Sequence, residues 1–101
     1  MGIDVQLRKE SGDIIEHVGD AQMILSRAAR QVFSGTRLLR YLMPWGDAIF
    51  NQAQADDLLN DIYVVKSNNP GTPLYEMLSK LEPLVEKLSR EVHLYLWFVG
   101  D

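Results

Sequence analysis

Apolar and polar residues alternate at the start of the chain, and this pattern predicts a β-hairpin. Ile3, Val5 and Leu7 are separated by polar residues, as in a strand with one buried face. Residues 11–13, Ser-Gly-Asp, form a turn sequence, and we expect residues 14–18 to be the second strand.

From Asp20 the spacing of apolar residues changes to steps of three and four, which predicts a helix. Its apolar face comprises Ala21, Ile24, Leu25, Ala28, Ala29, Val32 and Phe33. Asp20 is placed to cap this helix and Gly35 to end it. Residues 37–43 fit either period, but Pro44 disfavours a long helix. We therefore predict a second hairpin, with strands over 37–43 and 48–50.

Two further helices follow. Asn51 and Gln54 have the spacing of a capping box, and the helix behind them would bury Ala55, Leu58, Leu59, Ile62 and Val65. After a loop at 67–71, Thr72 is an N-cap and Pro73 a first helical residue. Apolar residues then recur in steps of four and three: Leu74, Leu78, Leu81, Val85, Leu88 and Val92.

Pro83 interrupts this last series, because proline lacks a backbone donor and its ring collides with the carbonyl group of Ser79. We expect a kink, or two helices end to end, packed on the sheet. The same spacing could serve as a coiled-coil seam, so a homodimer through the 74–92 helix stays open.

Residues 93–99 are apolar on both faces, which predicts an interior strand. The order of elements is then ββαββααβ. Hairpins pair antiparallel, and amphipathic helices cover one side of a sheet. We predict a single α+β domain over residues 1–101, with a mostly antiparallel sheet of about five strands and three helices.

The composition agrees with one globular domain. The chain has 101 residues, 47% of them hydrophobic, and a net charge of −4. Because it has no cysteine, disulfide scaffolds, cysteine-ligated metal sites and thiol enzymes are excluded. The first residues lack a basic segment followed by an apolar run, so we expect a cytoplasmic protein without membrane contact. No motif indicates a cofactor, and none is expected.

Charge is distributed unevenly. Residues 47–101 hold nine acidic and four basic side chains, whereas residues 1–46 hold five and six. The acidic helix face, as we name it, comprises Asp56, Asp57, Asn60 and Asp61. Such a face is typical of a solvated helix, and it also suits docking of a basic protein.

A cluster of opposite sign comprises Arg27, Arg30, Arg37 and Arg40. These arginines could contact phosphates, but the net acidic charge and the lack of a nucleic-acid-reading motif argue against a nucleic-acid partner. Alternatively, some of them pair with the acidic helix face. Among the aromatic residues, we expect Trp97 in the core and Trp45 exposed in its turn, where it could anchor a contact.

A small hydrolase is the alternative class. Asp4, Asp47, His93 and Asp101 lie at strand or turn ends, where an acid/base or metal site could gather them. The structural interpretation is stronger, since a turn aspartate such as Asp47 commonly accepts from local backbone N–H groups. We expect His93 to be hydrogen-bonded to backbone at the start of a buried strand. Neither His93 nor His17 has a second ligand at metal spacing, so no metal site is expected.

Two segments resemble a family of small bacterial proteins of unknown function. Residues 43–51, Met-Pro-Trp-Gly-Asp-Ala-Ile-Phe-Asn, are similar to its proline-aromatic-Gly-Asp turn and following short strand. Residues 93–101 are similar to its final aromatic strand, which ends in Gly-Asp. The resemblance names no activity. By type, a small acidic single-domain protein also resembles the immunity proteins of bacterial toxin systems, including contact-dependent growth inhibition.

This second resemblance implies a protein that neutralises a toxin domain by covering an essential surface. We therefore predict a non-enzymatic protein-binding module for a basic toxin, such as a nuclease. The acidic helix face would stand in for the phosphates that the toxin binds. The predicted contact residues are Trp45, Asp47, Asp56, Asp57, Asn60 and Asp61.

Overall fold

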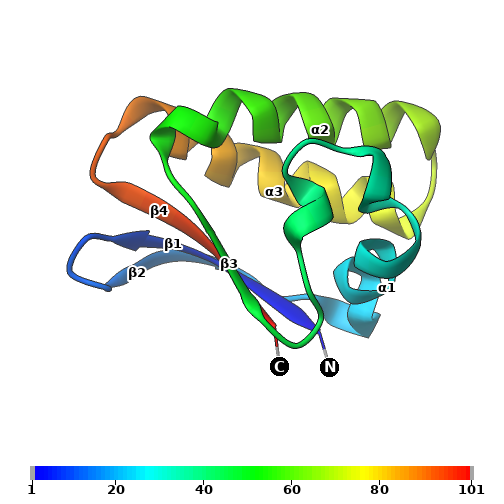
Figure 1. Ribbon diagram of the computed structural model, residues 1–101, viewed down its shortest axis with the longest axis horizontal. Helices are drawn as coiled ribbons and strands as arrows, with labels where there is room; N and C mark the ends of the chain where they lie inside the picture. Colours follow the sequence, from blue (N-terminus) through cyan, green and yellow to red (C-terminus); the bar gives the residue numbers. More distant parts are fainter. Residues whose placement is uncertain (1, 101) are drawn as a thin grey trace.

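Four strands form one antiparallel sheet in the order β2-β1-β4-β3, with the helices on one side of it (Figure 1). The computed structural model describes residues 2–100. The α+β class is confirmed, with four strands instead of five. The strands are β1 (Ile3–Lys9), β2 (Ile14–Val18), β3 (Asp47–Phe50) and β4 (Leu94–Gly100).

Alternation along β1 and β4 separates the two faces of the sheet. Ile3, Val5 and Leu7 of β1 are fully buried against the helices, and Leu94, Leu96 and Phe98 of β4 are buried on the same face. Residues between them point to the opposite side, which we call the outer face of the sheet. It carries Asp4, Gln6, Arg8, Asp47, Ile49, Tyr95, Trp97 and Val99. β4 lies between β1 and β3, so its predicted interior position is confirmed.

The helices are α1 (Ile24–Gln31), α2 (Ala55–Asn68) and α3 (Pro73–Arg90). Helix α3 contacts the sheet, α1 and α2, and the apolar series from Leu74 to Leu88 is buried in the resulting core. Only its last member, Val92, is exposed. This series therefore does not serve as the homodimer seam that its spacing left open, because the protein's own core already covers it.

The first helix is shorter than predicted. Its N-cap residue is Met23 and not the predicted Asp20, although the Asp20 carboxylate accepts hydrogen bonds from Leu25 N (2.8 Å) and Ser26 N (3.2 Å) in the first turn. The same carboxylate accepts from Ile3 N (3.0 Å) at the start of β1. To reach these donors the chain turns through Gln22 and Met23, which have positive φ angles of 62° and 55°. The α-helix consequently begins only after this turn.

Residues 37–43 do not form the predicted strand. They contain a 3₁₀ turn, Leu39–Tyr41, whose Leu39 is fully buried. The cause lies on α2, where the Asp61 carboxylate accepts hydrogen bonds from the backbone N–H groups of this segment. Those donors are unavailable for strand pairing, and β3 pairs with β4 instead.

Helix α3 runs through Pro83 as one helix, so the predicted division into two helices is wrong. Pro83 is exposed on the side away from the core, where its ring displaces no apolar contact. The helix nevertheless lacks the hydrogen bond that residue 83 would donate to the Ser79 carbonyl group. Packing of the leucine series on the core outweighs this local cost.

An ion pair and a cation–π contact connect α2 and α3. Lys66 Nζ lies 4.5 Å from the centre of the Tyr75 ring and forms an ion pair with Glu82. The hydrogen bond to Glu82 raises the pKa of Lys66 above 10.5. Because the folded pKa is raised, this contribution to stability is fully present below pH 10.5 and is lost as pH rises through the folded pKa.

Replacing Pro83 should stabilise the protein. Pro83→Ala restores a helical N–H donor and removes the ring that opposes the preceding turn, so we expect a gain of roughly 1–3 kcal/mol. Urea unfolding followed by circular dichroism measures it. Lys80→Ala, on the exposed side of the same helix, is the control and should change stability by less than about 0.5 kcal/mol. An unchanged or lower midpoint for Pro83→Ala would contradict this account of α3.

Candidate functional site

The acidic helix face is not the uncompensated surface that the sequence predicted. Asp61 is only 3% exposed, because it faces the 36–39 segment rather than solvent. Its carboxylate accepts from the backbone N–H groups of Arg37 (3.0 Å), Leu38 (2.7 Å) and Leu39 (3.1 Å). Three N–H donors satisfy this charge internally. Asp61 is therefore withdrawn from the predicted contact residues.

Asp57 is also partly engaged. Its Oδ1 lies 2.9 Å from Nη1 of Arg37, in an ion pair that remains open to solvent on both sides. Of the cluster of four arginines, Arg37 alone pairs with the acidic helix face within residues 2–100. Asp56 and Asn60 are exposed. What remains of the predicted face is Asp56 and Asn60, with Asp57 already compensated by a cation.

The residues of the hydrolase alternative do not converge. Asp4 and Asp47 flank Val99 from opposite sides of β4, two strand spacings or about 10 Å apart. Asp4 pairs with His17 on β2. His93 lies beyond the other end of β4, about 20 Å from Val99 along the strand. Asp101 lies outside the described residues.

The position of His93 also corrects an expectation. Its side chain is exposed, and Nδ1 lies 2.9 Å from Glu10 Oε1, so it is not bonded to the backbone of a buried strand. Among residues 2–100, no group of three or more carboxylate and histidine side chains is arranged to hold a metal ion.

A surface that the sequence did not predict as a unit combines arginine, methionine and aromatic side chains. We call it the arginine-aromatic surface. It comprises Met23, Arg27, Arg30, Arg40, Tyr41, Met43, Pro44 and Trp45. Trp45 is 62% exposed, which confirms the expectation of an exposed turn tryptophan. Tyr41, Met43 and Met23 are also about half exposed.

Aromatic rings and backbone carbonyl groups hold the three arginines of this surface. The guanidinium of Arg30 lies 5.4 Å from the centre of the Trp45 ring, and that of Arg40 lies 4.9 Å from the Tyr41 ring. Arg27 donates to the carbonyl oxygens of Gln22 and Met23. Within residues 2–100, none of the three forms an ion pair with a carboxylate.

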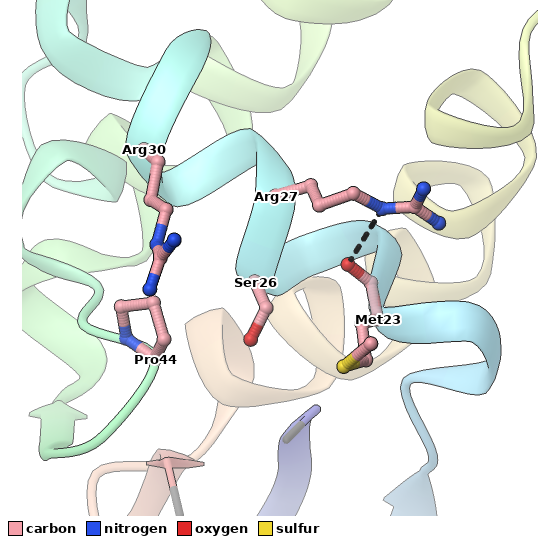
Figure 2. Close-up of a pocket in the computed structure, with 5 residues that line it drawn as sticks. All are labelled: Met23, Ser26, Arg27, Arg30 and Pro44. Carbon is pink, nitrogen blue, oxygen red and sulfur yellow. Dashed lines mark hydrogen bonds between the residues drawn. The ribbon is translucent and has the colours of Figure 1, made fainter.

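A small pocket of about 160 Å³ opens in this surface. Figure 2 shows Arg30 extending from α1 toward Pro44, with Ser26 and Met23 on the other side of the hollow. Arg27 points away from Pro44, toward the Met23 carbonyl group (Figure 2). The pocket is thus apolar at Met23 and Pro44 and cationic at Arg30, which suits an acidic or polar side chain with an aliphatic stem.

Gly100 positions the turn that carries Trp45. Gly100 N donates to the Gly46 carbonyl oxygen (3.0 Å), so the end of β4 lies directly against the turn. A Cβ atom on Gly100 would lie 2.5 Å from the Met43 oxygen and 2.6 Å from the Gly46 oxygen. The two segments that carry the family resemblance therefore contact each other, and this contact requires a glycine at the end of the strand.

The sequence showed the arginines and Trp45 separately, but no spacing indicated that they meet. Residues 30 and 45 come together because the 37–39 segment is tied to Asp61 and the 43–46 turn to Gly100. Trp97 differs from its prediction as well. It is partly buried on the outer face of the sheet, where the guanidinium of Arg8 lies 4.0 Å from its ring centre.

Comparisons with family models, with characterised proteins and with solved structures find no match for this chain. Within residues 2–100, no helix has the length and apolar character needed to cross a membrane.

Neutralising Asp61 should destabilise the fold. Asp61→Ala leaves three backbone N–H groups without their acceptor, and we expect a loss of roughly 2–4 kcal/mol in the free energy of unfolding. Asp56→Ala, one of the exposed acids of the same helix, is the control and should stay within about 0.5 kcal/mol of the unchanged protein. Urea unfolding distinguishes the two. Equal midpoints for both variants would show that Asp61 does not hold the 37–39 segment.

Gly100→Ala should displace the turn that carries Trp45. The added methyl group meets backbone oxygens rather than flexible side chains, so we expect a cost of about 1–3 kcal/mol. Because Trp45 is largely exposed, its fluorescence should become more sensitive to an added quencher as the turn loosens. Gly35→Ala, where nothing lies within 4 Å of the added Cβ, is the matched control. A Gly100→Ala protein with unaltered stability and fluorescence would be inconsistent with the close approach of Gly100 and Gly46.

Proposed function

We propose that this protein is a protein-binding module that acts in the cytoplasm by occluding a surface of its partner, as the immunity proteins that it resembles by type do. We assign the contact to the arginine-aromatic surface, centred on Trp45 and Arg30. The partner would then present acidic side chains at the contact. A contact through the acidic helix face would instead require a basic partner.

One observation carries this proposal. In a chain with a net charge of −4, Arg27 and Arg30 line one pocket and, like Arg40, have no carboxylate partner within residues 2–100. Arg30 and Arg40 each lie over an exposed ring. Tryptophan, tyrosine, arginine and methionine are the residues enriched at protein interfaces and at their energetic centres. Met23, Arg27 and Arg30 line one pocket and Trp45 lies beside Arg30, which supports a contact surface more strongly than a solvated one.

The charge of the surface also supports this choice over the acidic helix face. The Asp57 carboxylate already has an arginine beside it, and the Asp61 carboxylate is satisfied by backbone donors. A basic partner would have to compete with these internal contacts. An acidic partner would meet Arg27 and Arg30 with no carboxylate to displace, so charge attraction would speed encounter.

Association with the partner is tested on variants of this surface. The partner is isolated from a lysate of the source cells on immobilised protein, and its association is then measured at several salt concentrations. We expect Arg27→Glu combined with Arg30→Glu to slow association about tenfold or more at low salt and to flatten its salt dependence. Trp45→Ala should mainly raise the dissociation rate, by roughly tenfold to a hundredfold.

Asp56→Asn combined with Asp57→Asn is the comparison that decides between the two surfaces. Our proposal expects association to be unchanged in this variant. If association slows here and is unaffected by the arginine variants, the partner is basic and the acidic helix face is the contact. Circular dichroism on each variant ensures that the difference reflects the surface and not the fold.

A further inference from the structure

A second hollow lies beside the arginine-aromatic surface, between α1 and the start of α3. We call it the α1–α3 hollow, and its volume is about 280 Å³. Apolar side chains form its floor and walls, and an arginine stands at its rim. These residues are Ile24, Ala28 and Val32 along one side of α1, Pro73 and Leu74 of α3, and Arg27. Among the described residues, 2–100, no carboxylate lines it.

The apolar face predicted for the first helix is wider than the core requires. Ala28 and Leu74 are buried and form the floor of the hollow. Val32 is 36% exposed and Ile24 is half-buried, although both belong to the same apolar series. A side chain that enters the hollow would therefore remove apolar surface from water on both helices.

Arg27 is held at the rim by backbone carbonyl groups. Its Nε and Nη2 donate to the carbonyl oxygens of Met23 and Gln22, and its side chain points away from Pro44 (Figure 2). Its Nη1 has no hydrogen-bond partner within the described part of the chain. Because the guanidinium is already held in place, it loses little freedom when it binds a carboxylate.

We propose that the α1–α3 hollow binds an aliphatic side chain of a partner segment, with a glutamate beside it that pairs with Arg27. The hollow is smaller than the roughly 300–1,000 Å³ of small-molecule sites, which favours one side chain of a larger partner. Arg27 also lines the pocket beside Arg30, so a segment that crosses α1 reaches both. This inference rests on the proposed function, and it extends the contact to Ile24, Val32 and Pro73.

Three short peptides test both parts of the inference without knowledge of the partner. The probe is acetyl-Glu-Leu-Glu-amide, and its controls are acetyl-Glu-Ala-Glu-amide and acetyl-Gln-Leu-Gln-amide. In NMR spectra of the methyl-labelled protein, we expect the probe to shift the signals of Ile24, Val32 and Leu74 with a Kd of about 1–10 mM at low salt. The alanine peptide, which buries less aliphatic carbon, should bind at least about fivefold more weakly. The glutamine peptide should bind about threefold more weakly or less, and added salt should remove this difference.

A substitution in the wall of the hollow tests where the probe binds. Val32→Asn places an amide in the apolar wall and should weaken binding of the probe about fivefold or more. Val92→Asn is the matched control, because Val92 is 61% exposed and lies outside the hollow, and it should leave binding unchanged. Circular dichroism checks the fold of both variants.

Several results would overturn the inference. One is that the methyl signals do not shift, or shift equally with all three peptides. Another is that Val32→Asn binds the probe as the unchanged protein does. Signals that move with protein concentration in the absence of peptide would overturn it in favour of a second copy of the chain.

The isolated partner distinguishes this inference from the proposed function. We expect both Val32→Asn and Trp45→Ala to raise its dissociation rate. A partner that responds to Trp45→Ala but not to Val32→Asn overturns the inference and leaves the proposed function in place. A partner that responds to Val32→Asn but not to Trp45→Ala supports the hollow and contradicts a contact centred on Trp45.

Discussion

The rest of the structure depends on the contact between the Asp61 carboxylate and the backbone of residues 37–39. A carboxylate that accepts three N–H groups satisfies both its own charge and donors that would otherwise need a strand or water. This contact fixes the 37–39 segment against α2 and excludes it from the sheet. It thereby leaves β4 to pair with β3, and it directs residues 40–45 toward α1.

The same contact changes the electrostatics of the surface. Asp61, which the helix pattern placed in solvent, is buried. Arg37, in the segment that Asp61 holds, forms an ion pair with Asp57. Arg30 lies over Trp45 and Arg40 over Tyr41, and neither has a carboxylate partner within residues 2–100. The unpaired charges at this end of the molecule therefore include arginines, and the acidic helix face is smaller than the helix sequence indicated. A single buried acceptor thus removes one acidic side chain from the surface that the helix sequence indicated.

The sheet has an asymmetry of its own. The three helices lie on one side of the sheet, and the leucines of α3 are buried in the core on that side. On the outer face the guanidinium of Arg8 lies over the Trp97 ring, and Ile49, in register with Trp97, is about half exposed.

Local patterns in the sequence determined the class of the fold, because strand alternation, the Thr72 cap and the Asn51 capping box act over a few residues. They also placed Trp45 in an exposed turn. Only the tertiary structure decided that residues 37–43 leave the sheet, that Asp61 is buried and that Arg30 meets Trp45. Each of these depends on groups between 15 and 24 positions apart, and the spacing of residues along one element carries no information about such partners. A charged side chain looks the same in the sequence whether water or a distant backbone segment satisfies it.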